Sequence, residues 1–260
     1  QATSRKKQLE KITLDDIKPS SRKYPFIKFT PDREIGNDLV KVDNVSKSIE
    51  GVKILDNISF TLRPNEKTAL ISRNDLATTT LMQIIAGSMA PDSGTVTWGQ
   101  TTSRTYLPKD INEEYAGSEL PIIDWLRQFA SKEESDNTFL RGFLGKMLFS
   151  GSDVERPVNV LSGCEKVRGM LSKMMLSRAN VLLLDDPTNH LDLESITALN
   201  DSLIDFKGAI VFTSHDHEFI QTIADHIVEV SAKGVVDRGD TTYDEYLAHE
   251  ATQGRVQDLY

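Results

Sequence analysis

The chain contains a single cysteine, Cys164, among its 260 residues. An intramolecular disulfide is therefore impossible, and a reducing cytoplasm is the expected location. No apolar run reaches the roughly 18 residues that a membrane-spanning helix requires. No charged and then apolar leader opens the sequence. The sequence therefore predicts neither direct membrane insertion nor secretion.

Composition predicts a globular unit with a sizeable core, because 38% of the residues are apolar and 27% are charged. The net charge of −9 argues against a general nucleic-acid binder. This charge is uneven, since residues 1–29 contain eight Lys or Arg and only three acidic residues. A solvated basic arm is one interpretation of that segment. The first residue is Gln rather than Met, so we expect the chain to begin within a longer protein.

Hydrophobic periodicity predicts an α/β fold. Residues 39–45 and 54–62 have the alternation of strands in a small antiparallel layer. A short strand at 68–71, a loop and a helix at 79–86 form a frame suited to holding phosphate, and residues 111–160 are rich in helical patterns. Further on, helices and apolar strands alternate, which indicates a parallel sheet: 164–178, 181–184, 193–206, 209–213 and 216–224.

A buried-type strand at 181–184 leads directly into two carboxylates, Asp185 and Asp186. In phosphate-handling sheets, a carboxylate in this position holds Mg²⁺ and a neighbouring one activates water. The segment that follows, Pro187-Thr188-Asn189-His190-Leu191-Asp192, is a highly specific continuation. The alternative is an Asp pair that only caps the next helix.

Two other segments suit the binding of an anion. Leu161-Ser162-Gly163-Cys164-Glu165 opens a predicted helix, where the free amides of the first turn attract negative charge. Thr213-Ser214-His215-Asp216 follows a strand and presents a histidine. A metal site at His215 and His217 is disfavoured, because no second ligand cluster accompanies them except His190.

Together these segments resemble the nucleotide-binding cassette of ABC ATPases, in the soluble paired-cassette branch called ABC-F, over residues of about 39 to 246. The resemblance implies a P-loop NTPase-type parallel sheet with an antiparallel β subdomain and a helical insert at about 111–160. Residues 1–38 would be the basic end of an interdomain linker, 39–250 the nucleotide-binding domain and 251–260 a C-terminal tail. It implies ATP and Mg²⁺ as cofactors, and a second cassette and the ribosome, in translation, as partners.

The resemblance also implies roles for individual residues. Thr79 and Asp185 would hold Mg²⁺, and Asp186 and His215 would act in catalysis, with Asp186 one methylene shorter than the family's Glu. Ile49 stands near the family's adenine-stacking aromatic residue, and Lys109 stands where the family has a metal-contacting Gln. The remaining nucleotide contacts would come from the phosphate loop, with Ser72, Asn74, Asp75, Leu76, Ala77, Thr78, Thr79 and Thr80. A partner's nucleotide would face the signature residues Ser162, Gly163, Cys164 and Glu165.

The phosphate loop departs most from the family pattern Gly-x-x-x-x-Gly-Lys-Ser/Thr. Its residues are Ser72-Arg73-Asn74-Asp75-Leu76-Ala77-Thr78-Thr79, so both glycines and the lysine are missing. The Asp75 carboxylate would repel a phosphate oxygen by on the order of a few kcal/mol. Arg73 would offset part of this repulsion if it points inward.

Cys164 replaces a signature glycine, which requires a negative φ at that position; its simplest interpretation is an inert small buried thiol. Three functions remain open. The chain is an ATPase cassette using Thr79 and Asp186, a degenerate cassette with a structural or site-completing role, or the ATP-binding subunit of a membrane transporter.

Overall fold

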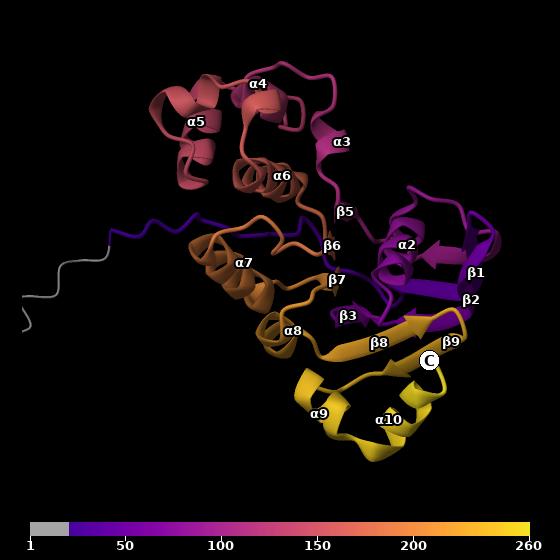
Figure 1. Ribbon diagram of the computed structural model, residues 1–260. Coiled ribbons are helices and arrows are strands. Elements are labelled where there is room, and N and C mark those ends of the chain that lie inside the picture. Colours follow the sequence, from indigo (N-terminus) through magenta and orange to yellow (C-terminus); the bar gives the residue numbers. More distant parts are fainter. Residues whose placement is uncertain (1–20) are drawn as a thin grey trace, which may run out of the picture.

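The computed structural model describes residues 21–260 (Figure 1). Residues 1–20, which carry most of the basic arm, lie outside the described residues, so the expected linker is described only from residue 21 onward. An antiparallel sheet has the strand order β2-β1-β4 and contains β1 (Val40–Ile49), β2 (Val52–Leu62) and β4 (Ser93–Trp98). The two predicted strands of this antiparallel layer are confirmed.

A second sheet has six strands in the order β5-β6-β7-β3-β8-β9. Its strands are β3 (Lys67–Ile71), β5 (Arg104–Leu107), β6 (Val181–Asp185), β7 (Ala209–Thr213), β8 (His226–Ser231) and β9 (Gly234–Arg238). All pairings are parallel except that of β8 with β9. Every residue of β6 and β7 is buried, as expected for central strands covered on both faces. The predicted parallel sheet is confirmed, and the carboxyl ends of β3, β6 and β7 lie at one edge.

Each face of the six-stranded sheet has its own apolar core. On one face, α2 (Asp75–Ala86) packs with the antiparallel sheet, with Leu81 and Ile85 buried against β1 and β2 residues. The other face is covered by α6 (Gly163–Ser177), α7 (Leu193–Asp205) and α8 (His217–Ile223). This arrangement holds the strand ends rigidly between two packed layers.

The helix-rich segment contains α3 (Asn112–Tyr115), α4 (Ile122–Arg127) and α5 (Asn137–Lys146), followed by 3₁₀ turns at Gly151–Glu155 and Val158–Val160. Figure 1 shows α4 and α5 gathered at one end, with α9 (Tyr243–Ala248) and α10 (Glu250–Gln257) at the opposite end. Within residues 21–260, no helix is both long and apolar enough to cross a membrane.

Both ends of the described chain are packed against the core. Near residue 21, at the first of these ends, Ile27 and Phe29 are buried. The Phe29 ring packs edge-on against the Phe206 ring, with 6.3 Å between the ring centroids. At the other end, residues 251–260 were expected to form a tail. They differ from that expectation because most of them belong to α10, and because Val256 and Leu259 are buried in the core.

The buried His226 forms a charged cluster with two carboxylates, and this cluster should make stability depend on pH. Its Nδ1 lies 3.0 Å from Glu66, and its Nε2 contacts Asp237. Burial opposes protonation, but the two carboxylates outweigh it and raise the pKa of His226 to about 9 from 6.5. Protonation therefore stabilises the fold fully below pH 6.5, and this contribution is lost as pH rises toward 9. The loss should be roughly 3 kcal/mol.

Urea unfolding at pH 6 and pH 9 checks this expectation, with a His226→Gln variant as the control. The native protein should lose stability across this interval, and the variant should lose much less. An equal pH dependence in both proteins would contradict it.

Candidate functional site

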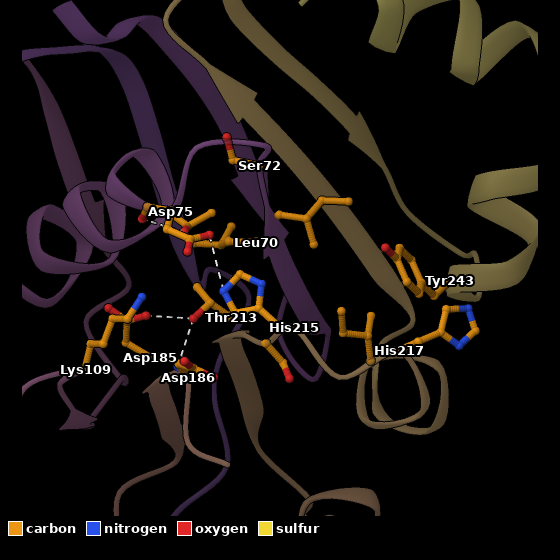
Figure 2. A pocket seen from close by; sticks show the side chains of 14 residues that line it. Leu70, Ser72, Asp75, Lys109, Asp185, Asp186, Thr213, His215, His217 and Tyr243 are labelled. Atoms are coloured by element: carbon orange, nitrogen blue, oxygen red, sulfur yellow. Dashed lines mark hydrogen bonds and ion pairs between the residues drawn. The ribbon is translucent and has the colours of Figure 1, made fainter. Parts of the chain in front are cut away.

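A pocket opens at the carboxyl ends of β3, β6 and β7 (Figure 2). Its volume is about 170 Å³. This is below the range of pockets that enclose a whole small-molecule ligand. Seven predicted site residues line it: Ser72, Asp75, Thr78, Lys109, Asp185, Asp186 and His215. The fold therefore brings together the loop, the paired carboxylates and the histidine, which lie far apart in the sequence.

Asp185 ends β6 and is only 2% exposed. Its Oδ1 accepts a hydrogen bond of 2.7 Å from the Thr213 hydroxyl, whereas Oδ2 is buried with no hydrogen-bond partner among the described residues. Burial raises the pKa of Asp185, while Thr213, the Thr79 hydroxyl and the Lys109 ammonium oppose the rise. An unpartnered carboxylate oxygen next to a threonine hydroxyl is an arrangement that suits a hard divalent cation.

Asp186 adopts a left-handed backbone conformation, with φ of 51°. Aspartate tolerates this region better than most residues, and such angles are common at functional sites. The Asp186 N–H donates to the Thr213 hydroxyl at 2.9 Å. Thr213 thus connects both acidic residues to β7 and fixes the turn after β6.

The phosphate loop is largely closed by its own hydrogen bonds. Helix α2 begins at Asp75 instead of the predicted residue 79, with Asn74 as its N-cap. The Leu76 amide donates to Asn74 Oδ1 and the Ala77 amide to the Asn74 carbonyl. The Asn74 amide donates to the Ser72 hydroxyl. The helix begins early because Asn is a favourable N-cap and no glycine interrupts the segment.

Asp75 lies at the start of α2 and points toward His215 (Figure 2). Its Oδ1 is 3.2 Å from His215 Nε2, and both side chains are more than half exposed. The histidine that would contact a γ-phosphate by resemblance is thus already paired with a carboxylate of the chain. Because a carboxylate and a phosphate are both anions, a phosphate that approached His215 would have to compete with Asp75.

The other loop residues lie away from the pocket or are packed. Leu76 is exposed, and Ala77 and Thr80 are buried in the fold. The Thr78 hydroxyl, at the position of the lost lysine, donates to the Asp75 carbonyl at 3.0 Å. Thr79 is near Asp185 but is not one of the residues lining the pocket.

Two further predicted positions lie outside the phosphate loop, and only one of them lines the pocket. Lys109 lies beside Asp185 and Asp186 and lines the pocket, so a positive charge is present near the carboxylates (Figure 2). Ile49, at the end of β1, packs against the core between α2 and the antiparallel sheet and does not line the pocket. An aliphatic side chain in that place offers no ring for stacking on a base.

The signature segment forms a well-defined helix start outside the pocket. Ser162 caps α6, and a capping box joins its hydroxyl to the Glu165 amide and its own amide to the Glu165 carboxylate. Arg156 also forms an ion pair with Glu165, with 2.6 Å between Arg156 Nη1 and Glu165 Oε1. Ser162 and Gly163 are exposed. The signature is therefore folded and accessible, although it does not contact the pocket of its own chain.

Cys164 belongs to α6 and has the negative φ that its replacement of glycine requires. Its environment differs from the expected inert buried thiol, because it is only half-buried and interacts with charged groups. Arg168 Nη1 lies 3.0 Å from the sulfur, and Asp192 Oδ2 lies 3.8 Å away.

Sequence reasoning did not assign four of the residues that contribute to the site. Thr213 was recognised only as part of a motif and not as the link between Asp185 and Asp186. Tyr243 and His217 line the pocket with their rings 5.1 Å apart. Tyr260 contacts the phosphate loop, since the Arg73 amide donates to its hydroxyl at 2.9 Å. No local pattern could reveal this last contact, which joins residues far apart in the sequence.

The residues suit the two implied cofactors differently. Mg²⁺ fits the free oxygen of Asp185 and the Thr79 hydroxyl. Among residues 21–260, no cluster of three or more His, Cys, Asp or Glu is arranged to hold a metal ion, so the other ligands would be water or groups of a bound molecule. The phosphates of ATP fit poorly, because loop amides are already bonded and Asp75 adds a negative charge.

Comparison with known proteins identifies the family. The sequence pattern of the ABC transporter family matches residues 55–189. The chain is 60% identical over 260 residues to the "Uncharacterized ABC transporter ATP-binding protein YkpA" of Bacillus subtilis, covering all of this chain and 48% of that protein. It is 37% identical over 247 residues to the "Probable ATP-binding protein YbiT" of Escherichia coli O157:H7, covering 95% of this chain and 46% of that protein. The chain thus spans about half the length of these relatives.

Solved structures agree in fold. The ATP-binding subunit of an ABC transporter superposes with a TM-score of 0.66 at 22% identity, covering 85% of this chain and 98% of that one. A post-hydrolysis dimer of an ATP-binding cassette bound to ADP and phosphate gives 0.62 at 17% identity, covering 79% of this chain and all of the other. The chain belongs to the ABC transporter family and is an ATP-binding cassette of an ABC protein.

The burial of Asp185 predicts a stability cost at the site. Because burial raises the pKa of Asp185, the folded state disfavours its charged form, and Asp185→Asn should stabilise the protein at pH 7. Thermal unfolding without added metal measures the change. Asp186→Asn is the matched control and should shift stability much less; a lower melting temperature for the Asp185 variant would contradict the expectation.

Proposed function

We propose that this cassette belongs to an ABC-F type protein and that its main role is to complete the nucleotide site of a second cassette. Its own phosphate loop then binds nucleotide weakly. The pair of Asp75 and His215 is the observation that carries this proposal, because it fills the phosphate position with a negative charge of the chain. The capped and exposed signature supports the second half of the proposal.

The ABC-F assignment includes action in the cytoplasm on ribosomes, by closure of two cassettes. Support comes from Thr188-Asn189-His190-Leu191-Asp192, which resembles the soluble paired-cassette branch. The twofold length of the matched relatives supports a protein with two cassette-sized halves. Sedimentation of the intact protein with ribosomes, in the presence and absence of ATP, tests this part. Absence from the ribosomal fraction in both conditions would oppose it.

Slow ATP hydrolysis by this cassette is a second candidate. The free Oδ2 of Asp185 beside Thr79 favours it, because these groups suit Mg²⁺. Asp186 would then position the attacking water, with its shorter side chain limiting the rate.

Calorimetry with Mg²⁺ and ATP distinguishes the two candidates. We expect the native chain to bind no tighter than millimolar, and an Asp75→Gly, Thr78→Lys variant to bind at least tenfold more tightly. The reason is that this variant removes the competing carboxylate and restores the cation of the phosphate loop. Micromolar binding by the native chain would oppose the proposal and support the hydrolysing cassette.

The site-completing role predicts a separate result in the intact protein. Ser162→Arg places a bulky side chain on the signature surface and should lower the ATPase activity of the paired protein at least tenfold. Thr79→Val removes a hydroxyl of this cassette's own site and should lower it less than twofold. If Thr79→Val has the larger effect, hydrolysis occurs in this cassette and not in its partner.

A further inference from the structure

Arg73 is the only Lys or Arg in the loop segment 72–80. It would be the natural replacement for the missing lysine, yet it does not line the pocket. Its guanidinium carbon lies 4.1 Å from the centroid of the Tyr260 ring. A cation held over an aromatic face is stabilised there and is directed away from the phosphate position.

The backbone of Arg73 is held by the same residue. Its amide donates to the Tyr260 hydroxyl at 2.9 Å, and that hydroxyl lies 3.0 Å from Glu229 Oε1. An amide only donates and a carboxylate only accepts, so the hydroxyl must accept from Arg73 and donate to Glu229. Both the side chain and the main chain of Arg73 are therefore restrained by Tyr260.

Tyr260 is itself firmly attached to β8. Glu229 is buried, and its second oxygen accepts a hydrogen bond of 2.7 Å from Tyr246. The neighbouring Leu259 is buried, and Lys233 Nζ donates to the Tyr260 carbonyl at 2.9 Å. Burial raises the pKa of Tyr260, which keeps its phenol protonated and able to donate at neutral pH.

We propose that Tyr260 is an autoinhibitory clamp on the phosphate loop and that Arg73 is a latent phosphate-binding side chain. When the clamp opens, the guanidinium can form a bidentate contact with a phosphate and offset the charge of Asp75. Tyr260 follows α10 in the chain and is hydrogen-bonded to Glu229 of β8, so a partner that moves the segment after α10 away from β8 would release Arg73. This inference rests on the proposed function only in taking the loop as closed to nucleotide.

A mutant cycle in the Asp75→Gly, Thr78→Lys background tests the role of Arg73. Tyr260→Leu removes both the ring and the hydroxyl, and should tighten Mg²⁺-ATP binding by about tenfold, the worth of one charge-assisted contact. Adding Arg73→Ala should abolish that gain. Tyr246→Phe is the matched control, because it breaks the other hydrogen bond of Glu229 and leaves Arg73 clamped. It should leave the affinity unchanged.

Amide hydrogen exchange tests the clamp without nucleotide. In the otherwise native chain, Tyr260→Phe should speed exchange of the Arg73 amide at least tenfold, and Tyr246→Phe should not. Unchanged Arg73 exchange, or an affinity gain that persists without Arg73, would overturn the inference. If the Asp75→Gly, Thr78→Lys variant binds no nucleotide, the proposed function loses its support, while the exchange experiment still decides whether the clamp exists.

Discussion

The internal hydrogen bonding of the phosphate loop determines what the rest of the site can do. Asn74 accepts hydrogen bonds from the amides of Leu76 and Ala77, and the Tyr260 hydroxyl accepts one from the amide of Arg73. A phosphate-binding loop depends on such donors remaining available to an anion. Once these amides are hydrogen-bonded within the chain, the Asp75 carboxylate no longer has to compete with a bound anion. The Asp75 carboxylate pairs instead with His215.

Much of this architecture could be predicted from the sequence, because it depends on burial and strand order. The continuous apolar run of β6 and β7 marks central strands, and parallel strands place their carboxyl ends together. It follows that Asp185, Asp186 and His215 meet at one edge, as the motifs indicated. The signature also forms its helix where expected, since Ser162 and Glu165 make a capping box that can be recognised locally.

Other features depend on contacts that no local pattern contains. The early start of α2 results from a good N-cap and a glycine-free loop acting together, whereas helical spacing alone had indicated a start at residue 79. The burial of Leu259 in the core turns an expected tail into part of the fold. The environment of Cys164 depends on Arg168, one helical turn further on, and on Asp192 from a different segment.

The two helix starts of the cassette differ in what surrounds the acidic residue of the first turn. Both α2 and α6 begin with a capping side chain and an acidic residue in the first turn. In α6 the acidic Glu165 turns back onto its own cap and is neutralised by Arg156, so the exposed turn before it keeps its attraction for anions. In α2 the acidic Asp75 faces the pocket and no arginine accompanies it, because Arg73 is stacked on Tyr260. The direction in which one carboxylate points therefore separates the two helix starts: Glu165 is neutralised within its own cap, whereas Asp75 adds a negative charge to the pocket.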